Sequence, residues 1–184
     1  MIKNKKDYLR YIKNEETKMR RSYPTFTREL ELILKYIKLY RKAEYYYNCK
    51  PHSLRGKIII RKWQRKSFEY GFHLPLNVID EGLCIIHIGP IYINEFVKIG
   101  KDLRIHPMTT IGKSIGREES CPVIGDGVWI GPGARIYGAI VIGNNSVIGC
   151  NAVVNKDVKE NMTVAGIPAK IINNKGYLDY FQKN

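Results

Sequence analysis

His87 is the side chain whose type and position point most directly to chemistry. Isoleucines recur six positions apart at Ile93, Ile99 and Ile105, and a count of six back from Ile93 reaches His87, so a histidine stands where the pattern requires an aliphatic residue. Local rules of sequence are broken most often at functional sites. An imidazole at such a place can accept the proton of a bound hydroxyl group as a general base. The alternative is a partly buried structural histidine.

His106 and Cys121 are candidates for the same site. His106 follows His87 by 19 residues, so the two are expected on neighbouring coils of the repeat and one position out of register. We expect His106 to bind the acceptor, with a surface or subunit-interface histidine as the alternative. Cys121 follows residues 113–120, where the six-residue spacing of the isoleucines slips by one residue. An inserted loop is expected there, which either closes over a substrate or is a surface loop without function. Cys121 is expected to line the site and not to act as a nucleophile, since no neighbour in the sequence favours its thiolate.

A six-residue repeat must position these side chains, and it is the strongest periodicity in the chain. One aliphatic residue occurs per unit, glycine often follows it, and a small or β-branched residue stands four positions after it. A period of six fits a short strand and a corner, with one side chain per unit pointing to a common axis, and fits neither an α-helix nor an alternating strand. The aliphatic positions are Ile93, Ile99, Ile105, Ile111, Ile124, Ile130, Ile136, Ile142, Ile148 and Val154.

Three such units close a triangular coil of about 18 residues, and successive coils stack about 4.8 Å apart. Residues 75–159 therefore provide roughly four to five coils. A protein of alternating strands and helices is excluded, because helical periodicity is absent between residues 75 and 158. The sequence thus predicts a mainly β fold built as a parallel β-helix.

The first 70 residues differ from the rest in charge. They hold 20 Lys and Arg against seven Asp and Glu, a net charge of +13 out of +14 for the chain. Apolar residues at spacings of three and four predict a helix from Thr27 to Tyr47, a further helix from Leu54 to Tyr70 and a shorter one in the first twenty residues. The charge has three explanations: a solvated basic face, attraction to an anionic membrane surface or lipid-linked phosphate, or nucleic-acid binding. The last is disfavoured, because no recognition motif accompanies the charge.

Several protein classes are excluded by what the sequence lacks. No segment approaches the roughly 18 apolar residues of a membrane span, and residues 1–18 lack the apolar core of a signal peptide. The cysteines at 49, 84, 121 and 150 form neither a CxxC pair nor a disulfide framework. We therefore expect reduced thiols and a cytoplasmic location, either free or at the inner face of the membrane. A zinc site would need a close pair of histidines, so no metal is expected.

The repeat resembles that of the hexapeptide-repeat acyltransferases, and in particular their serine O-acetyltransferase-like branch. The resemblance covers roughly residues 73–172 and rests on HIGPIYIN (87–94), IHPMTTIG (105–112), CPVIGDGVWIGPGARI (121–136) and VAGIPAKII (164–172). It implies a left-handed β-helix, against the usual right-handed crossover. We expect a basic α-helical region at 1–70, an acetyltransferase β-helix at 71–172 and a tail at 173–184.

The resemblance also implies an active site and a cosubstrate. His87 matches the family's catalytic histidine, which takes the proton of a hydroxyl acceptor as that hydroxyl attacks the thioester of acetyl-CoA, with no covalent enzyme intermediate and no metal. The family forms trimers with each site between neighbouring subunits, so a homotrimer is expected. Acetyl-CoA is expected to contact backbone and lysine cations at Pro132, Cys150, Asn155, Lys156 and Lys170.

Two departures from the serine enzymes affect the expected acceptor. Cys121 replaces a second active-site histidine, and Phe72 replaces the aspartate that partners the catalytic histidine. We therefore expect a sugar hydroxyl acceptor in envelope or capsule glycan synthesis, with L-serine as the first alternative. A non-catalytic β-helical scaffold that docks on a membrane through the basic helices is the second alternative. The side chain that orients His87 stays open among His73, Asp80 and Glu81.

Overall fold

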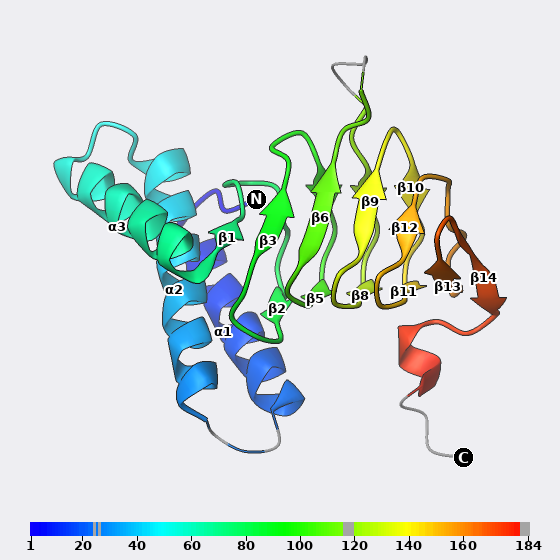
Figure 1. The fold of residues 1–184 in the computed structure, drawn as a ribbon. Helices are drawn as coiled ribbons and strands as arrows, with labels where there is room; N and C mark the ends of the chain where they lie inside the picture. Colours follow the sequence, from blue (N-terminus) through cyan, green and yellow to red (C-terminus); the bar gives the residue numbers. More distant parts are fainter. Residues whose placement is uncertain (24, 26, 116–119, 181–184) are drawn as a thin grey trace.

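Three α-helices open the chain and lie together at one end of the molecule (Figure 1). The computed structural model describes residues 1–23, 25, 27–115 and 120–180. The helices are α1 (Lys5–Ser22), α2 (Arg28–Cys49) and α3 (Leu54–Tyr70). Each begins at a polar side chain, Asn4, Thr27 or Ser53, that accepts a hydrogen bond from the backbone amide three residues later. Such caps satisfy amides that the first helical turn leaves unpaired, so they fix where each helix starts.

Short strands joined by turns follow along the rest of the chain that the structure describes. They run as β1 (Phe72–His73), β2 (Cys84–Ile85), β3 (Ile91–Ile93), β4 (Lys98–Ile99), β5 (Arg104–Ile105), β6 (Thr109–Gly112), β7 (Val123–Ile124), β8 (Trp129–Ile130), β9 (Arg135–Tyr137), β10 (Val141–Ile142), β11 (Val147–Ile148), β12 (Val153–Val154), β13 (Thr163–Gly166) and β14 (Ala169–Asn173). A 3₁₀ helix at Tyr177–Tyr180 follows.

These strands form three sheets that are the sides of a triangular coil (Figure 1). Their orders are β1-β3-β6-β9-β12, β10-β7-β4 and β14-β13-β11-β8-β5-β2. Ile124 pairs in parallel with Ile142, 18 positions later, which is one full coil of three six-residue units. Among the paired strands described, β13 and β14 alone run antiparallel. The predicted parallel β-helix is therefore confirmed.

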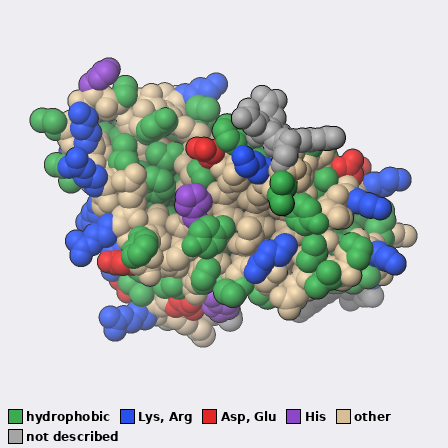
Figure 2. Space-filling model, turned by 45° about the horizontal axis from the view of Figure 1, so that its top comes forward, with side chains coloured by type: hydrophobic (Ala, Val, Ile, Leu, Met, Phe, Trp, Pro, Cys, Tyr) green, Lys and Arg blue, Asp and Glu red, His purple; other side chains and the backbone are tan. Residues whose placement is uncertain are grey.

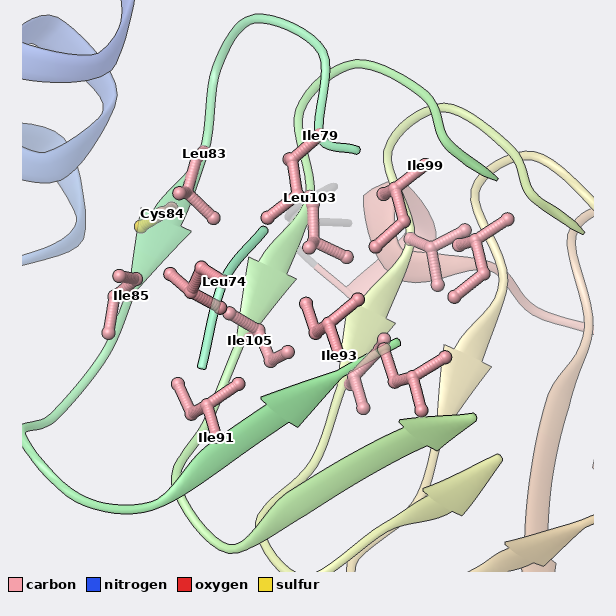
Figure 3. Close-up of a cluster of buried hydrophobic side chains, with 14 of the residues drawn as sticks. Leu74, Ile79, Leu83, Cys84, Ile85, Ile91, Ile93, Ile99, Leu103 and Ile105 are labelled. Carbon is pink, nitrogen blue, oxygen red and sulfur yellow. The ribbon is translucent and has the colours of Figure 1, made fainter. Parts of the chain in front are cut away.

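The core follows the six-residue repeat. All ten aliphatic positions of the repeat are buried, and so are the small or β-branched residues four places after the anchors from Ile124 onward. Figure 3 shows the side chains of the first coils, among them Ile93, Ile99 and Ile105, pointing into the space between the strands. Because each unit contributes its side chains to the same axis, one continuous apolar core runs along the β-helix.

Two coils are longer than the regular spacing predicts. Ile85 pairs with Ile105, 20 positions later, so the inward-pointing residue of this coil is Ile85 and not His87. The prediction that His87 replaces an aliphatic anchor is wrong, because two extra residues in the corner after β2 move it out of that register. Ile99 pairs with Ile124, 25 positions later, so the insertion between β6 and β7 is larger than the one-residue slip suggested. Part of that predicted loop, 116–119, lies outside the described residues.

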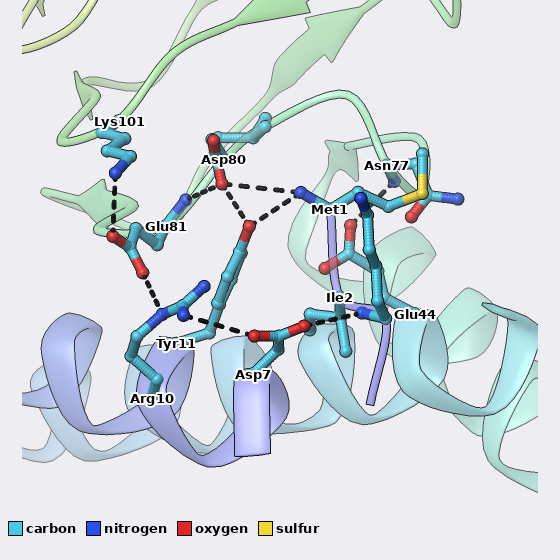
Figure 4. A network of polar contacts seen from close by, with 12 residues as sticks. Met1, Ile2, Asp7, Arg10, Tyr11, Glu44, Asn77, Asp80, Glu81 and Lys101 are labelled. Carbon is cyan, nitrogen blue, oxygen red and sulfur yellow. Dashed lines mark hydrogen bonds and ion pairs between the residues drawn. The ribbon is translucent and has the colours of Figure 1, made fainter. Parts of the chain in front are cut away.

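Buried charge joins the helices to the first coil. Arg41 of α2 is fully buried, pairs with Glu15 of α1 and with Glu44, and donates hydrogen bonds to the carbonyl oxygens of Ile79 and Asp80. Nearer the surface, a second network links α1 to the same coil (Figure 4). In it, Tyr11 donates to the Asp80 carboxylate, and Arg10 and Lys101 both pair with Glu81. The helices are therefore held in a fixed position against the β-helix.

On the face that Figure 2 shows, the basic side chains do not form one continuous surface. Figure 2 shows Lys and Arg at the outer edge of the helical region, at the opposite end of the β-helix and at separate places between them, with side chains of other types around them. Several basic side chains of the helices are engaged within the chain, such as Lys18 with Asp102 and Lys38 with Glu16. In the part of the chain that is described, no helix combines the length and apolarity needed to span a bilayer.

Candidate functional site

Four of the predicted site residues lie along one edge of the β-helix, which we call the histidine edge. It is the row of corners that follow the strands of the six-stranded sheet, and it contains His87 after β2, His106 after β5, Pro132 after β8 and Cys150 after β11. Backbone hydrogen bonds connect successive corners: Gly133 N–H donates to Pro107 over 3.1 Å and Asn151 N–H donates to Pro132 over 2.9 Å. Since the side chains of His87, Pro132 and Cys150 are exposed, this edge offers a continuous accessible surface.

The His87 imidazole is held by a carboxylate from the helical region. Nδ1 donates to Oε2 of Glu29 over 3.1 Å, and Oε1 of Glu29 accepts the backbone amide of Ile88 over 2.9 Å. The His87 side chain is 56% exposed and that of Glu29 37% exposed, so the pair sits at the surface within reach of a ligand. The ring of Tyr23 meets the His87 ring edge-on at 6.4 Å between centroids. Because Glu29 accepts at Nδ1, Nε2 is the ring nitrogen that can take up a proton.

The three side chains that sequence reasoning left open as partners of His87 are engaged elsewhere. His73 stacks on Tyr92, Asp80 accepts from Tyr11, and Glu81 pairs with Arg10. Phe72, at the position of the family's aspartate, is buried with its ring 4.9 Å from that of Tyr36. Sequence reasoning missed Glu29, which lies 58 positions before His87, and no local pattern links the two.

His106 lies on the coil next to His87, as its spacing predicts. Its Nδ1 donates to the carbonyl oxygen of Ile130 over 2.8 Å, which leaves Nε2 as a hydrogen-bond acceptor. Its ring packs on Trp129 with 4.7 Å between centroids. Burial lowers the pKa of His106 more than the Ile130 carbonyl raises it, and electrostatic interaction with Arg104 and His87 acts in the same direction as burial. A neutral imidazole suited to accept a hydrogen bond therefore stands beside His87.

Three other predicted residues, Cys121, Asn155 and Lys156, lie along a different edge, which we call the cysteine edge. It consists of corners between the five-stranded and the three-stranded sheets: Cys121 comes just before β7, and Asn155 and Lys156 follow β12. The Cys121 thiol lies 3.3 Å from Oδ1 of Asn94, and burial raises its pKa, which disfavours the thiolate. Within one chain, the structure does not bring this group together with His87.

Lys170 lies at the far end of the histidine edge. It is exposed on β14 and pairs with Ala165 of β13. β13 is the strand that pairs with β11, and the corner of Cys150 follows β11. The predicted cosubstrate residues are thus divided between the two edges: Pro132, Cys150 and Lys170 on one, Asn155 and Lys156 on the other. Asn155 donates to the Tyr137 hydroxyl over 3.3 Å, and Lys156 is exposed.

A groove among the described residues lies away from His87 and His106. It has a volume of about 1010 Å³ and runs between α3 and the first coil, where Trp63, Phe68, Tyr92 and Phe96 line it. His87 does not line this groove, so its size alone does not mark the chemical site. No group of three or more metal-binding side chains occurs in the described ranges.

Comparisons with known proteins agree with this architecture. Residues 121–156 match the family model of the bacterial transferase hexapeptide (six repeats). A serine acetyltransferase of Buchnera aphidicola is 31% identical over 150 residues, which cover 80% of this chain and 53% of the relative. Two solved structures are similar at 25% identity: a Brucella abortus serine acetyltransferase in complex with coenzyme A (TM-score 0.75, 94% of this chain, 70% of that chain) and a Neisseria gonorrhoeae serine acetyltransferase in complex with serine (TM-score 0.71, 92% and 70%).

These comparisons confirm the predicted left-handed β-helix and the resemblance to serine acetyltransferases. The chain spans about half the length of the curated relatives that it matches. Their shared name favours the serine alternative over the sugar acceptor that we expected from the two departures.

Proposed function

We propose that the chain, a left-handed β-helix that resembles the serine acetyltransferase-like branch of the hexapeptide-repeat acyltransferases, transfers the acetyl group of acetyl-CoA to the hydroxyl group of L-serine. Serine thereby replaces the sugar hydroxyl as the first choice of acceptor. The observation that carries the proposal is the exposed imidazole of His87, held at Nδ1 by Glu29 with Nε2 left to act as a base.

The proposed reaction is a direct transfer with His87 as general base and then general acid. Nε2 accepts the hydroxyl proton as the hydroxyl oxygen attacks the thioester carbonyl carbon. The C–S bond then breaks, and the same proton passes from Nε2 to the departing CoA sulfur. The ester and the free thiol are the products, and His87 returns to its starting state without a covalent intermediate.

His106 has the geometry for acceptor binding. Its Nε2 is the ring nitrogen that can accept a hydrogen bond, because Nδ1 is fixed on the Ile130 carbonyl. The ammonium group of serine is a donor that fits such an acceptor. We assign Cys121 to the lining of the same site and not to nucleophilic chemistry, since burial of its thiol disfavours the charged form.

Acetyl-CoA needs a groove for its pantetheine arm and cations for its phosphates. The exposed corners at Pro132 and Cys150 carry no charged side chain of their own, and the exposed ammonium groups of Lys170 and Lys156 supply cations. Because Lys156, Asn155 and Cys121 lie on a second edge, we propose a homotrimer in which the histidine edge of one protomer faces the cysteine edge of its neighbour. A cytoplasmic location is part of the same proposal.

Thiol release from acetyl-CoA tests the proposal. We expect release with L-serine and none with UDP-sugars or glycan acceptors. Thiol release with a sugar acceptor and not with serine would contradict serine as the acceptor but would support acetyl transfer. No release with any hydroxyl acceptor would contradict the enzyme and favour the scaffold alternative. Anionic vesicles, added at low and high salt, test the membrane contact that the scaffold requires, since charge-driven binding falls steeply with salt.

A further inference from the structure

We propose that Glu29 positions His87, so that the first turn of α2 is a working part of the site. The inference rests on the proposed function. The Glu29 carboxylate bridges two groups of the same corner. One oxygen accepts a hydrogen bond from Nδ1 of His87 over 3.1 Å, and the other accepts one from the backbone amide of Ile88 over 2.9 Å. One carboxylate therefore holds both the His87 ring and the backbone next to it, which fixes the orientation of the ring relative to the corner.

The fold explains why Glu29 can take this place. Thr27 caps α2, which puts Glu29 in the first turn of the helix, where the helix dipole stabilises a carboxylate. The next residue, Leu30, is buried in the core and fixes the start of the helix against the β-helix. Glu29 thus reaches the corner after β2 from a rigid element and not from a loop.

The bond has a chemical consequence for His87. A carboxylate at Nδ1 selects the tautomer with its proton on that nitrogen, so Nε2 carries the lone pair that a general base needs. The same negative charge stabilises the imidazolium that forms when Nε2 takes up the hydroxyl proton. Partial burial alone would raise the pKa of Glu29, but the Ile88 amide and the His87 ring lower it further than burial raises it. The carboxylate is therefore charged at neutral pH.

Other groups near His87 do not replace this function. Tyr23 meets the His87 ring edge-on, and its hydroxyl donates to the carbonyl oxygen of Ile86. His106 is committed through Nδ1 to the Ile130 carbonyl. Among the described contacts of His87, Glu29 is the one carboxylate.

Nitrogen-15 spectra of the histidine rings test the bond without reference to activity. In the wild-type chain, the neutral form of the His87 ring should show a protonated Nδ1 and an unprotonated Nε2. In Glu29→Gln the two nitrogens should move toward the averaged shifts of an exposed histidine. Glu31→Gln is the matched control, because Glu31 lies two residues further along α2 and pairs with Lys35 instead. His87 signals unchanged by Glu29→Gln, or an averaged ring in the wild-type chain, would overturn the proposal.

Kinetics then test whether the bond matters for the reaction. Glu29→Gln should lower kcat for acetyl transfer roughly 10- to 100-fold, less than loss of a fully buried triad aspartate costs, and should change KM for acetyl-CoA less than about twofold. Glu29→Asp keeps the charge and should recover part of kcat. An unchanged kcat in Glu29→Gln would refute the positioning function. If the wild-type chain acts on no acceptor, the proposed function fails, while the ring spectra still decide the bond.

Discussion

Arg41 of α2 and Glu15 of α1 form an ion pair with no exposure to solvent, with 2.6 Å between Nη2 and Oε1. A buried guanidinium is stable only when charge and hydrogen bonds compensate it, and Arg41 obtains these from two carboxylates and two backbone carbonyls. One residue thus ties both long helices to the first coil, which is the coil that leads to His87.

Removal of Arg41 should therefore destabilise the fold strongly. Arg41→Ala leaves Glu15 and Glu44 buried without their cation, and we expect a loss of about 3–5 kcal/mol in the free energy of unfolding. Urea denaturation followed by circular dichroism measures it. Lys35→Gln, which breaks the exposed pair with Glu31, is the control and should change stability by less than about 1 kcal/mol. A loss below about 1 kcal/mol in Arg41→Ala would contradict this account.

The same cluster should make stability depend on pH. Burial raises the pKa of Glu15 to about 7, against the opposing charge of Arg41, because one guanidinium cannot neutralise two buried carboxylates. The folded state then holds a proton that the unfolded chain loses near 4.5, so stability should fall as pH rises from about 4.5 to about 7. Glu15→Gln should flatten that slope. Urea denaturation midpoints measured across this pH range test the expectation. If the midpoint changes equally with pH in the wild-type chain and in Glu15→Gln, the expectation is wrong.

Loss of the His87 imidazole should remove the reaction and leave the fold. His87→Ala should lower the rate of acetyl transfer by about 10²-fold or more, since a general base contributes that much. The His87 side chain is 56% exposed and lies outside the buried core, so the melting temperature should stay within a few degrees of wild type. His52→Ala, at an exposed turn between α2 and α3, is the matched histidine control. Equal activity in both variants would rule out His87 as the base.

The division of candidate residues between two edges predicts complementation between subunits. At limiting acetyl-CoA, His87→Ala and Lys156→Glu should each be inactive alone. When the two are unfolded and refolded together at equal amounts, about one quarter of the sites should combine an intact His87 with a neighbour's intact Lys156. Thiol release at that level supports sites shared between protomers. Failure of mixed samples to gain activity, with trimers present by sedimentation, would place the whole site within one chain.

The repeat was predictable from sequence because its cause is local. Apart from the step from Ile111 to Ile124, each aliphatic anchor is six residues from the next, and all ten are buried. The register of His87 was not predictable in the same way, because extra residues in one corner leave the spacing pattern ambiguous, and only the pairing of Ile85 with Ile105 resolves it. Glu29 could not be found at all, since its contact with His87 depends on how α2 docks against the coil.

The two ends of the strand stack are closed in different ways. β2 is the last strand of its sheet, and α1 packs beside it, with Ser22 and Cys84 3.3 Å apart at their side-chain oxygen and sulfur. At the other end, β14 turns back antiparallel on β13. An open parallel stack would offer unpaired amides and carbonyls to further chains and could polymerise along its axis. Here α1 covers β2 and the antiparallel β14 covers β13, so addition of a further parallel strand to the six-stranded sheet is disfavoured at both ends.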